Sequence, residues 1–533
     1  MKTPILKAAW LVLTPAVLVA AVITTLVAPW FRHRPDLGAA VLVVSIITTS
    51  IWMLLIWLAL HRLVFQLAAL WPPPSSSLSK PEAVKSVPRF GVFYTTCDDF
   101  VSESLLSCIR QDYPEDAFKV IVCDDSREPG NRASIDALCS GQERVTVVRR
   151  SERSGFKAGN LNHSFKLLQA DAFDWIVVVD ADQILSSEFL SRLAGDAAAA
   201  PEHAACIQAV PKWQEKSMLP PSGPFQQTMD EDACLVLNRD LPWRSHAGFY
   251  PCLGRVAAVR ASAWNAVGGF PECVSEDYAF SMAARSKGWV CIPAGSASLC
   301  DRGPRDFAAF VIQLSKYASG TSELIRYGYF EFLRGPAHWV EKLDVSLWLA
   351  GYASMPLVLL NLPLSAWLAH VVWQQQLSLL PPGLASIFVG MTLLSFPVLV
   401  SVTDTIGGAM HRFFWTFAIY NAALPGAAVS FVRHFWKRPV FRRTPKGNHP
   451  ASSVRTESCI TVLVGMTFTG IAFGWHSPFS LLIGSVAAAQ LLFPLFQHLH
   501  ASSGTGAVAR TLVWLPGIMF LTGVLDIWLR GSC

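Results

Sequence analysis

The sequence predicts an α/β domain with a mixed, mainly parallel sheet, inserted between the helices of an α-helical membrane domain. The chain has 533 residues, of which 52% are hydrophobic and 15% are charged, so it is too apolar for one soluble domain. Apolar stretches long enough to cross a bilayer bracket one more polar region, residues 72–344. Inside that region, short β-rich runs alternate with helical patterns, which is typical of βαβ units.

The apolar stretches predict membrane-spanning helices, because a spanning helix needs about 20 apolar residues. The first stretch is followed at once by a second without a small-residue cleavage pattern, so we expect a retained anchor and not a signal peptide. The 12 Cys contain no CxxC pair, which indicates reduced thiols in a cytoplasmic domain. The predicted spans are 8–30, 40–61, 345–373, 378–403, 457–475, 478–498 and 511–529.

Basic residues between 433 and 455 set the expected orientation, because cytoplasmic loops of membrane proteins are rich in Lys and Arg. With that loop and residues 72–344 both inside, the apolar stretch 413–432 cannot cross, and we expect an interfacial or re-entrant helix there. We therefore expect an integral protein of the cytoplasmic membrane with an external C-terminus. The expected units are 1–71 (two spans), 72–344 (cytoplasmic domain), 345–403 (hairpin), 404–456 (interfacial helix and basic loop) and 457–533 (three spans).

The net formal charge of +5 reflects the residues that flank the membrane segments, so it gives no reason to expect a nucleic acid partner. Membrane lipids are the expected surroundings. Accessory secretion subunits and the oligomeric state stay open.

The polar region reads as alternating strands and helices. The predicted strands are 89–96, 118–125, 144–150, 174–182 and 204–210, and the predicted helices lie near 100–112, 131–140, 157–170 and 186–198. In open α/β sheets, ligands bind at the carboxyl ends of the strands.

Acidic pairs stand at three of these strand ends. Asp98 and Asp99 follow the first strand, residues 124 and 125 are both Asp at the end of the second, and Asp180 and Asp182 follow the fourth. A single such Asp is often only a helix N-cap. Three pairs at one edge indicate a site, and the D-x-D spacing after a buried strand suits Mg²⁺ or Mn²⁺ bound together with a diphosphate.

Two further stretches carry polar groups that chemistry could use. Lys157 lies where the helix after the third strand begins, so it could meet diphosphate charge beside the helix N-terminal amides, or it could be an ordinary exposed lysine. Glu276 and Asp277 stand at a helix start, where acids are usually partners of the helix dipole. They could also supply a general base for a hydroxyl nucleophile.

Over residues 89–447 the order of motifs resembles the membrane-embedded family-2 glycosyltransferases, which include cellulose, chitin and hyaluronan synthases. Members of that family carry an Asp after the second strand, K-A-G-N-L-N, D-x-D, T-E-D and Q-x-x-R-W in this order. The matching residues here are Asp124-Asp125, Lys157-Ala158-Gly159-Asn160-Leu161-Asn162, Asp180-Ala181-Asp182, Ser275-Glu276-Asp277 and Gln313-Leu314-Ser315-Lys316-Tyr317.

The resemblance implies a GT-A-type nucleotide-sugar domain and an inverting, metal-dependent transfer from a UDP-sugar to a growing polysaccharide. It implies that Asp277 is the base, with Glu276 beside it, and that Asp180 and Asp182 hold Mg²⁺ or Mn²⁺. UDP-glucose is the favoured donor, and UDP-N-acetylglucosamine and GDP-mannose stay open. The implied donor-binding residues are Thr95, Asp124, Asp125, Lys157, Asp180, Gln313 and Lys316, and the implied acceptor-binding residues are Gly254 and Tyr317.

A sixth match lies in the basic loop. Cellulose synthases have a gating loop F-x-V-T-x-K over the bound nucleotide, and this chain offers Phe441, Thr444 and Lys446, with Arg443 in place of the Val. The match and the spans after the catalytic domain favour a processive synthase that threads its product through the membrane. Two alternatives remain: a transferase that adds one sugar to a lipid acceptor, and a transporter whose cytoplasmic domain senses a nucleotide.

The motifs also depart from the family pattern. Ser275 replaces the Thr of T-E-D, and Lys316-Tyr317 replace Arg-Trp. Lys is a point charge where Arg is a planar fork, so the two are not equivalent. Leu253 and Arg255 around Gly254 differ from cellulose synthases as well. These changes concern the acceptor and the linkage more than the donor chemistry.

Overall fold

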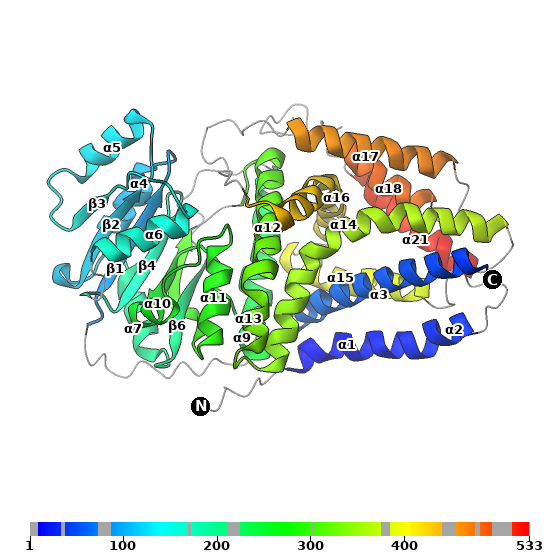
Figure 1. Cartoon of the computed structure of the whole chain (residues 1–533), viewed down its shortest axis with the longest axis horizontal. Coiled ribbons are helices and arrows are strands. Elements are labelled where there is room, and N and C mark those ends of the chain that lie inside the picture. Colours follow the sequence, from blue (N-terminus) through cyan, green and yellow to red (C-terminus); the bar gives the residue numbers. More distant parts are fainter. Residues whose placement is uncertain are drawn as a thin grey trace.

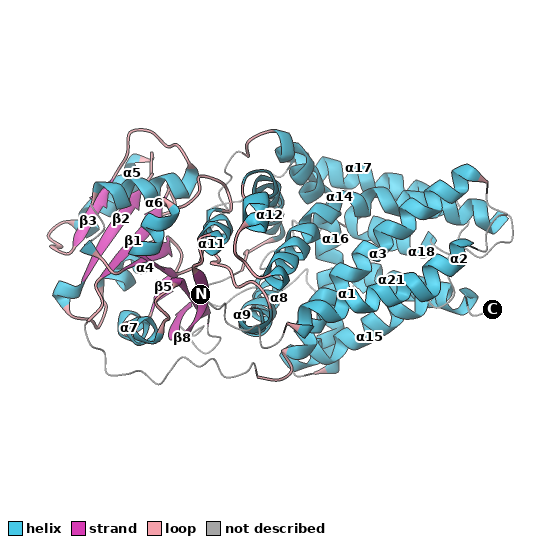
Figure 2. Ribbon diagram, turned by 60° about the horizontal axis from the view of Figure 1, so that its bottom comes forward, coloured by secondary structure: helices cyan, strands magenta, loops and turns pink. Residues whose placement is uncertain are grey.

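The computed structural model describes residues 9–32, 38–72, 87–168, 172–211, 224–300, 303–374, 384–403, 405–439, 455–474, 480–492 and 514–531. A domain built on a β-sheet occupies one end of the molecule, and long helices that run side by side occupy the other (Figure 1). Figure 2 shows the same division by secondary structure, with the strands confined to one end. This arrangement matches the predicted α/β domain and α-helical membrane domain.

The sheet has eight strands in the order β3-β2-β1-β4-β7-β6-β8-β5. β1 pairs in parallel with β2 and β4, and β2 pairs in parallel with β3. β7 is antiparallel to both β4 and β6, β8 is parallel to β6, and β5 is antiparallel to β8. The strands are β1 Phe90–Thr96, β2 Phe118–Asp124, β3 Val145–Val148, β4 Trp175–Asp180, β5 Ile184–Leu185, β6 Ala204–Pro211, β7 Ala257–Arg260 and β8 Val290–Cys300.

Two hydrophobic cores lie on opposite faces of this sheet because successive side chains of a strand point to opposite sides. In β1, Val92 and Tyr94 join the core under α4, α5 and α7, whereas Phe93 joins the core under α6, α10 and α11. The helices of this domain are α4 Ser102–Ile109, α5 Pro129–Cys139, α6 Phe156–Leu167, α7 Phe189–Ala199, α8 Pro224–Cys234, α9 Leu241–Ala247, α10 Ala261–Val267, α11 Glu276–Ser286, α12 Phe307–Tyr327 and α13 Tyr329–Arg334, with short η2 Glu115–Ala117 and η5 Leu235–Asp240.

The five predicted strands and the four predicted helices of the first half of the domain correspond to observed elements. The prediction did not identify β5, β7 or β8, which complete the sheet beyond β4. Two of these three strands, β5 and β7, pair only in antiparallel fashion. The antiparallel additions make the sheet mixed and mainly parallel, as expected for the fold class.

The remaining helices form the second part of the molecule. Among the described residues, four helices are long and apolar enough to cross a membrane: Trp10–Val27, Ala39–Ala68, Trp339–Val371 and Ile406–Trp436. Ser458–Gly474, Ser480–Leu491 and Trp514–Asp526 are shorter apolar helices inside three further predicted spans. The helices are α1 Trp10–Val22 (continued by η1 Ile23–Val27 and α2 Ala28–Arg32), α3 Ala39–Ala68, α14 Trp339–Gln374, α15 Leu384–Thr403, α16 Ile406–Trp436, α17 Arg455–Gly474, α18 Ser480–Leu491 and α21 Trp514–Gly531.

A buried polar cluster joins the two parts. Asp344 of α14 accepts a hydrogen bond from the backbone N–H of Phe249 at 2.8 Å and lies 2.9 Å from His61 Nε2 of α3. Arg244 of α9 forms an ion pair with the same carboxylate and stacks over Phe65. Because α3 and α14 are both candidate spans, this cluster fixes the sheet domain to the membrane helices.

Candidate active site

The predicted acids meet at one edge of the sheet, as the parallel register requires. Thr95 of β1 is paired with Asp180 of β4, and Thr96 is paired with Asp124 of β2. The Thr95 hydroxyl lies 3.2 Å from Asp180 Oδ1. The carboxyl ends of three neighbouring strands therefore carry these groups side by side.

Lys157, from the first turn of α6, joins three of the predicted motifs. Its ammonium lies 2.7 Å from Asp180 Oδ1 and 3.8 Å from Glu276 Oε1, and it donates a hydrogen bond to the carbonyl of Gly254 at 3.2 Å. Burial by itself would lower the pKa of Lys157, but Asp180 and Glu276 outweigh burial and raise it. The lysine is therefore a fixed positive charge at the centre of the site.

Glu276 and Asp277 begin α11, next to this lysine. Burial raises the pKa of Glu276 to about 7, while the charge of Lys157 acts in the opposite direction. Burial also raises the pKa of Asp277, against the hydrogen bond from the Tyr278 backbone N–H and the charges of Lys157 and Lys316. A carboxylate with a raised pKa is a better proton acceptor, which is what a general base needs.

Gly254 lies directly against Asp277. Its φ is +63°, and a Cβ at this position would stand 2.5 Å from Asp277 Oδ2. Only glycine combines this backbone conformation with so close an approach. The loop around Gly254 is held by Gln208, whose Oε1 accepts from the backbone N–H of Leu253 at 2.8 Å.

Two arginines form ion pairs with the carboxylates at the end of β2. Asp124 is 1% exposed, and its two oxygens accept from the Ser126 backbone N–H at 2.8 Å and from Arg149 Nε at 2.6 Å. Asp125 binds Arg150 through both oxygens, at 2.9 and 2.8 Å. The predicted role of Asp124 and Asp125 in donor binding stays a prediction, and in this structure these acids orient the two arginines.

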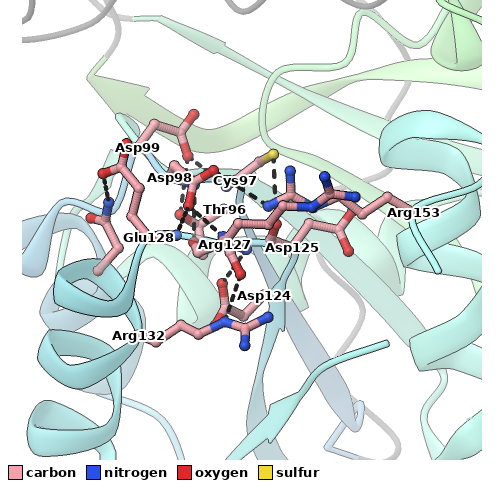
Figure 3. A network of polar contacts seen from close by, with 12 residues as sticks. Thr96, Cys97, Asp98, Asp99, Asp124, Asp125, Arg127, Glu128, Arg132 and Arg153 are labelled. Carbon is pink, nitrogen blue, oxygen red and sulfur yellow. Dashed lines mark hydrogen bonds and ion pairs between the residues drawn. The ribbon is translucent and has the colours of Figure 1, made fainter. Parts of the chain in front are cut away.

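Asp98 ties three loops together beside these pairs (Figure 3). Its Oδ1 accepts from the backbone N–H groups of Arg127 at 2.5 Å and Glu128 at 2.8 Å, and its Oδ2 lies 3.3 Å from Arg153. Asp98 has a φ of 58°, which is uncommon for a residue other than glycine. The loops after β1 and β2 and the loop before α6 are thereby fixed around one side of the site.

Two asparagines of the K-A-G-N-L-N stretch connect α6 to neighbouring parts of the site. Asn160 donates to the carbonyl of Cys123 at 2.9 Å, which fixes α6 to the end of β2. Asn162 donates to the carbonyl of Phe270 at 2.8 Å and accepts from the Phe270 backbone N–H at 2.9 Å. It thus holds the turn that precedes α11, so one short stretch positions both Lys157 and the approach to Asp277.

The predicted donor-binding residues Gln313 and Lys316 and the predicted acceptor-binding residue Tyr317 lie on α12, which stands between the sheet domain and the long helices in Figure 1. Tyr317 is 39% exposed, and its ring meets Tyr352 of α14 edge-on at 6.4 Å between centroids. Lys316 is near enough to Glu276 and Asp277 to oppose the rise of their pKa values that burial causes. Gln313 is half-buried on the same helix. Phe441, Thr444 and Lys446 of the predicted gating loop lie outside the described residues.

The two acids of the D-x-D motif fit a divalent cation that is bound together with a substrate. Among the described residues, no group of three or more His, Cys, Asp or Glu side chains could hold a metal ion by itself. Asp180 and Asp182 are both half-buried at the end of β4. Mg²⁺ in such sites is bound by one or two carboxylates plus substrate phosphates, so two acids suit a metal that arrives with a nucleotide diphosphate.

Two protein-family models match this chain. The one described as Glycosyl transferase family 2 matches residues 92–233, and the one described as Glycosyl transferase family group 2 matches residues 175–423. Residues 92–423 of this chain therefore form a glycosyltransferase family 2 region. The matched residues run from β1 into α16 and include every predicted site residue outside the gating loop. The resemblance drawn from motif order is therefore confirmed.

Curated relatives of this family-2 glycosyltransferase share part of its length. Glucomannan 4-beta-mannosyltransferase 9 of Arabidopsis thaliana is 26% identical over 241 residues, which cover 44% of this chain and 43% of that protein. Cellulose synthase 2 of Novacetimonas hansenii is 25% identical over 236 residues, covering 41% of this chain and 13% of that protein. The chain thus spans less than half the length of these relatives.

Among solved structures, a mannosyltransferase of Pyrobaculum calidifontis in complex with GDP-Man and Mn²⁺ is similar to this glycosyltransferase. It is 18% identical with a TM-score of 0.47, and the match covers 73% of this chain and 99% of that one. The family assignment rests on the sequence matches.

Reasoning from the sequence missed several residues that shape the site of this glycosyltransferase. Arg149 and Arg150 end the third β-rich run, and the run before it in the chain ends in two aspartates. The order of these two runs was the available signal in the sequence. No sequence signal pointed to Gln208 or to the role of Asp98, because both act on backbone groups of distant loops.

Proposed function

We propose that this glycosyltransferase is an inverting, metal-dependent polysaccharide synthase that transfers sugars from a UDP-sugar to a growing glycan. The observation that carries the proposal is the meeting of Lys157, Asp180, Glu276 and Asp277 at one sheet edge, beside a helix that leads toward the membrane domain. A half-buried lysine suits a diphosphate, and the carboxylate pair beside it, with Glu276 buried and Asp277 half-buried, suits proton removal.

In the proposed reaction, Asp277 accepts the proton of an acceptor hydroxyl. The hydroxyl oxygen bonds to the anomeric carbon as the bond from that carbon to the diphosphate oxygen breaks, and UDP leaves. Attack from the opposite face converts an α-linked donor into a β-linked product. Lys157 offsets charge on the leaving diphosphate, and Asp180 and Asp182 would hold Mg²⁺ or Mn²⁺, which supplies further positive charge there when bound.

The proposal also concerns the identity of the sugar donor. UDP-glucose is favoured by the gating-loop residues Phe441, Thr444 and Lys446. GDP-mannose is the second candidate, because several relatives are glucomannan 4-beta-mannosyltransferases. UDP-N-acetylglucosamine stays open as a third. The names of both kinds of relative, glucomannan 4-beta-mannosyltransferase and cellulose synthase, favour a polysaccharide product over a single sugar on a lipid.

The proposed membrane arrangement keeps α16 at the cytoplasmic surface, although it is long enough to cross. Its contacts with α8 and α12 extend along its length: Arg412 forms an ion pair with Asp232 of α8 at 3.5 Å, Tyr420 donates to Asp232 at 2.7 Å, and Ser430 donates to the Ser315 carbonyl of α12 at 3.0 Å. A helix that crossed the membrane could touch a cytoplasmic domain near one end only. These contacts therefore support an interfacial helix between the proposed hairpin 345–403 and the three C-terminal spans.

Buried polar groups support passage of a glycan through the membrane helices. Both side-chain amide atoms of Asn361 in α14 and of Gln490 in α18 are buried, and no hydrogen-bond partner for them is found among the described residues. An unsatisfied polar group is costly in an apolar interior. Hydroxyl groups of a translocating sugar chain would satisfy these amides.

The test of the proposed function uses the full chain in inverted membrane vesicles. We expect transfer from one labelled donor out of UDP-glucose, GDP-mannose and UDP-N-acetylglucosamine, only with Mg²⁺ or Mn²⁺, and a polymer protected inside the vesicles. Product sizing and linkage-specific glycosidases identify the chain. A single sugar on extracted lipid would favour the lipid-acceptor alternative, and failure with every donor would overturn the proposal.

Tyr317 offers a separate test of the acceptor platform. The Tyr317 ring is smaller than the Trp ring that the family pattern has at this position, and aromatic rings contribute to binding through their contact area. We therefore expect Tyr317→Trp to change product length or linkage. The KM for the donor should change by less than about twofold. Product sizing and glycosidase digestion measure this. An unchanged length and linkage would remove Tyr317 from the acceptor site. Tyr327→Trp, at an exposed tyrosine near the end of α12, is the matched control.

A further inference from the structure

The loop that leads to Asp277 is held by a helix outside its own element. The backbone N–H of Val274, three residues before Asp277, donates to Glu323 Oε2 of α12 at 2.9 Å. Both Val274 and Glu323 are only 4% exposed. A buried backbone N–H that loses its acceptor is costly, so this bond is a strong restraint on the loop.

A second contact lies one turn earlier on α12. The backbone of Gly320 packs so closely on Ser275 that a Cβ added at Gly320 would overlap the Ser275 hydroxyl oxygen. Ser275 is two residues before Asp277. The absence of a side chain at Gly320 therefore sets how near α12 comes to the loop.

The same helix carries the predicted acceptor-binding residue Tyr317. Tyr317 lies one turn before Gly320, and residues three apart on a helix share a face. α12 is a single helix of 21 residues, and its apolar side is buried against Trp415, Ala418 and Ile419 of α16. Contact of α12 with both α16 and the loop leaves the loop and Tyr317 attached to one rigid body.

We infer that α12 is a brace between the acceptor and the base, with Glu323 and Gly320 as positioning residues for the Asp277 carboxylate. The inference rests on the proposed function, since it takes Asp277 as the base and Tyr317 as part of the acceptor site. Glu323 and Gly320 contact Val274 and Ser275, which lie on the segment that leads to Asp277. They act by fixing the separation between a bound acceptor and Asp277, and a shift of about 1 Å in such a separation can cost about 10²-fold in rate.

We therefore expect a weakened brace to lower turnover without weakening donor binding. The donor-binding groups Lys157 and Asp180 lie on α6 and β4, which keep their own contacts when the brace is weakened. Glu323→Ala removes the acceptor for the Val274 N–H, so the loop should loosen and kcat should fall. Glu323→Gln keeps an oxygen acceptor of the same length and should retain the restraint.

The experiment compares four variants of the full chain in membrane vesicles with the donor that the wild type uses. We expect Glu323→Ala and Gly320→Ala to lose about 10-fold to about 10²-fold in kcat, with donor KM and the Kd for UDP changed by less than about twofold. Glu323→Gln should stay within about threefold of the wild type. Ser322→Ala is the matched control, because the Ser322 hydroxyl is buried beside Glu323 but donates to the Ser319 carbonyl within α12 itself.

The outcomes separate this inference from the proposed function. An unchanged kcat in Glu323→Ala, or an equal loss in Glu323→Gln and Glu323→Ala, would overturn the brace. If Glu323→Ala does not accumulate as folded protein, the kcat of Gly320→Ala decides by the same criterion. A wild type that transfers no sugar from any donor contradicts the proposed function instead.

Discussion

Asp277→Asn is expected to lower transfer by about 10²-fold to about 10⁴-fold, the usual contribution of a general base. The amide keeps the size of the carboxylate and its hydrogen bond to the Tyr278 backbone N–H, but it cannot take the proton of the acceptor hydroxyl. Donor binding should be nearly unchanged, because Lys157 forms its ion pairs with Asp180 and Glu276. Rates of UDP release and the Kd for UDP measure the two effects.

Asp112→Asn is the control for this variant, since Asp112 is an exposed aspartate of the same domain.

The wild type should also lose activity as the pH falls, because a base works only when deprotonated and burial raises the pKa of Asp277 above its usual range. The acid side of the kcat profile should therefore lie at higher pH than for an ordinary aspartate. An active Asp277→Asn variant would end the assignment of this residue as the base.

Asp180→Asn is expected to lower transfer by about 10²-fold or more and to raise the concentration of Mg²⁺ or Mn²⁺ needed for half-maximal activity. Asp180 has two tasks in the proposed reaction: it is the nearest partner of Lys157, at 2.7 Å, and it would hold the cation with the diphosphate. Removal of the cation by EDTA should abolish transfer in the wild type, and added Mn²⁺ should restore it. Metal titrations of the transfer rate measure both quantities.

Asp182→Asn should raise the metal requirement as well, but it leaves the contact between Lys157 and Asp180 in place. Asp116→Asn, which changes an exposed aspartate before β2, serves as the control. Full activity in EDTA together with an unchanged metal requirement in Asp180→Asn would show that transfer proceeds without a cation at this edge.

Several parts of the fold followed from local patterns. The β-branched and aromatic runs of β1, β2 and β4 identified the strands, and an acid at the end of β2 and of β4 identified the edge of the sheet where a site could form. Periodicity could not identify β5, β7 and β8. Strand β5 has two residues, and β7 has four whose partners come from β4 and β6.

The candidate site divides in the same way. The motifs named Lys157, Asp180, Glu276 and Asp277, and the structure brings Lys157 against Asp180 and Glu276. The motifs did not reveal that Asp124 and Asp125 are engaged by arginines, because that depends on β2 and β3 lying next to each other in register. Residue types and their order predict which groups are present, but not which group each one contacts.

The sequence by itself therefore determined the class of the protein: a catalytic α/β domain between apolar helices, with acids at strand ends and a lysine at a helix start. These features arise within short stretches, where hydrophobic periodicity and residue chemistry act locally. The tertiary structure alone decided that Glu323 holds Val274, that Gly320 lies against Ser275 and that α16 runs beside α12. Such contacts join residues far apart in the chain, and they form only because burial of several elements together fixes their separation.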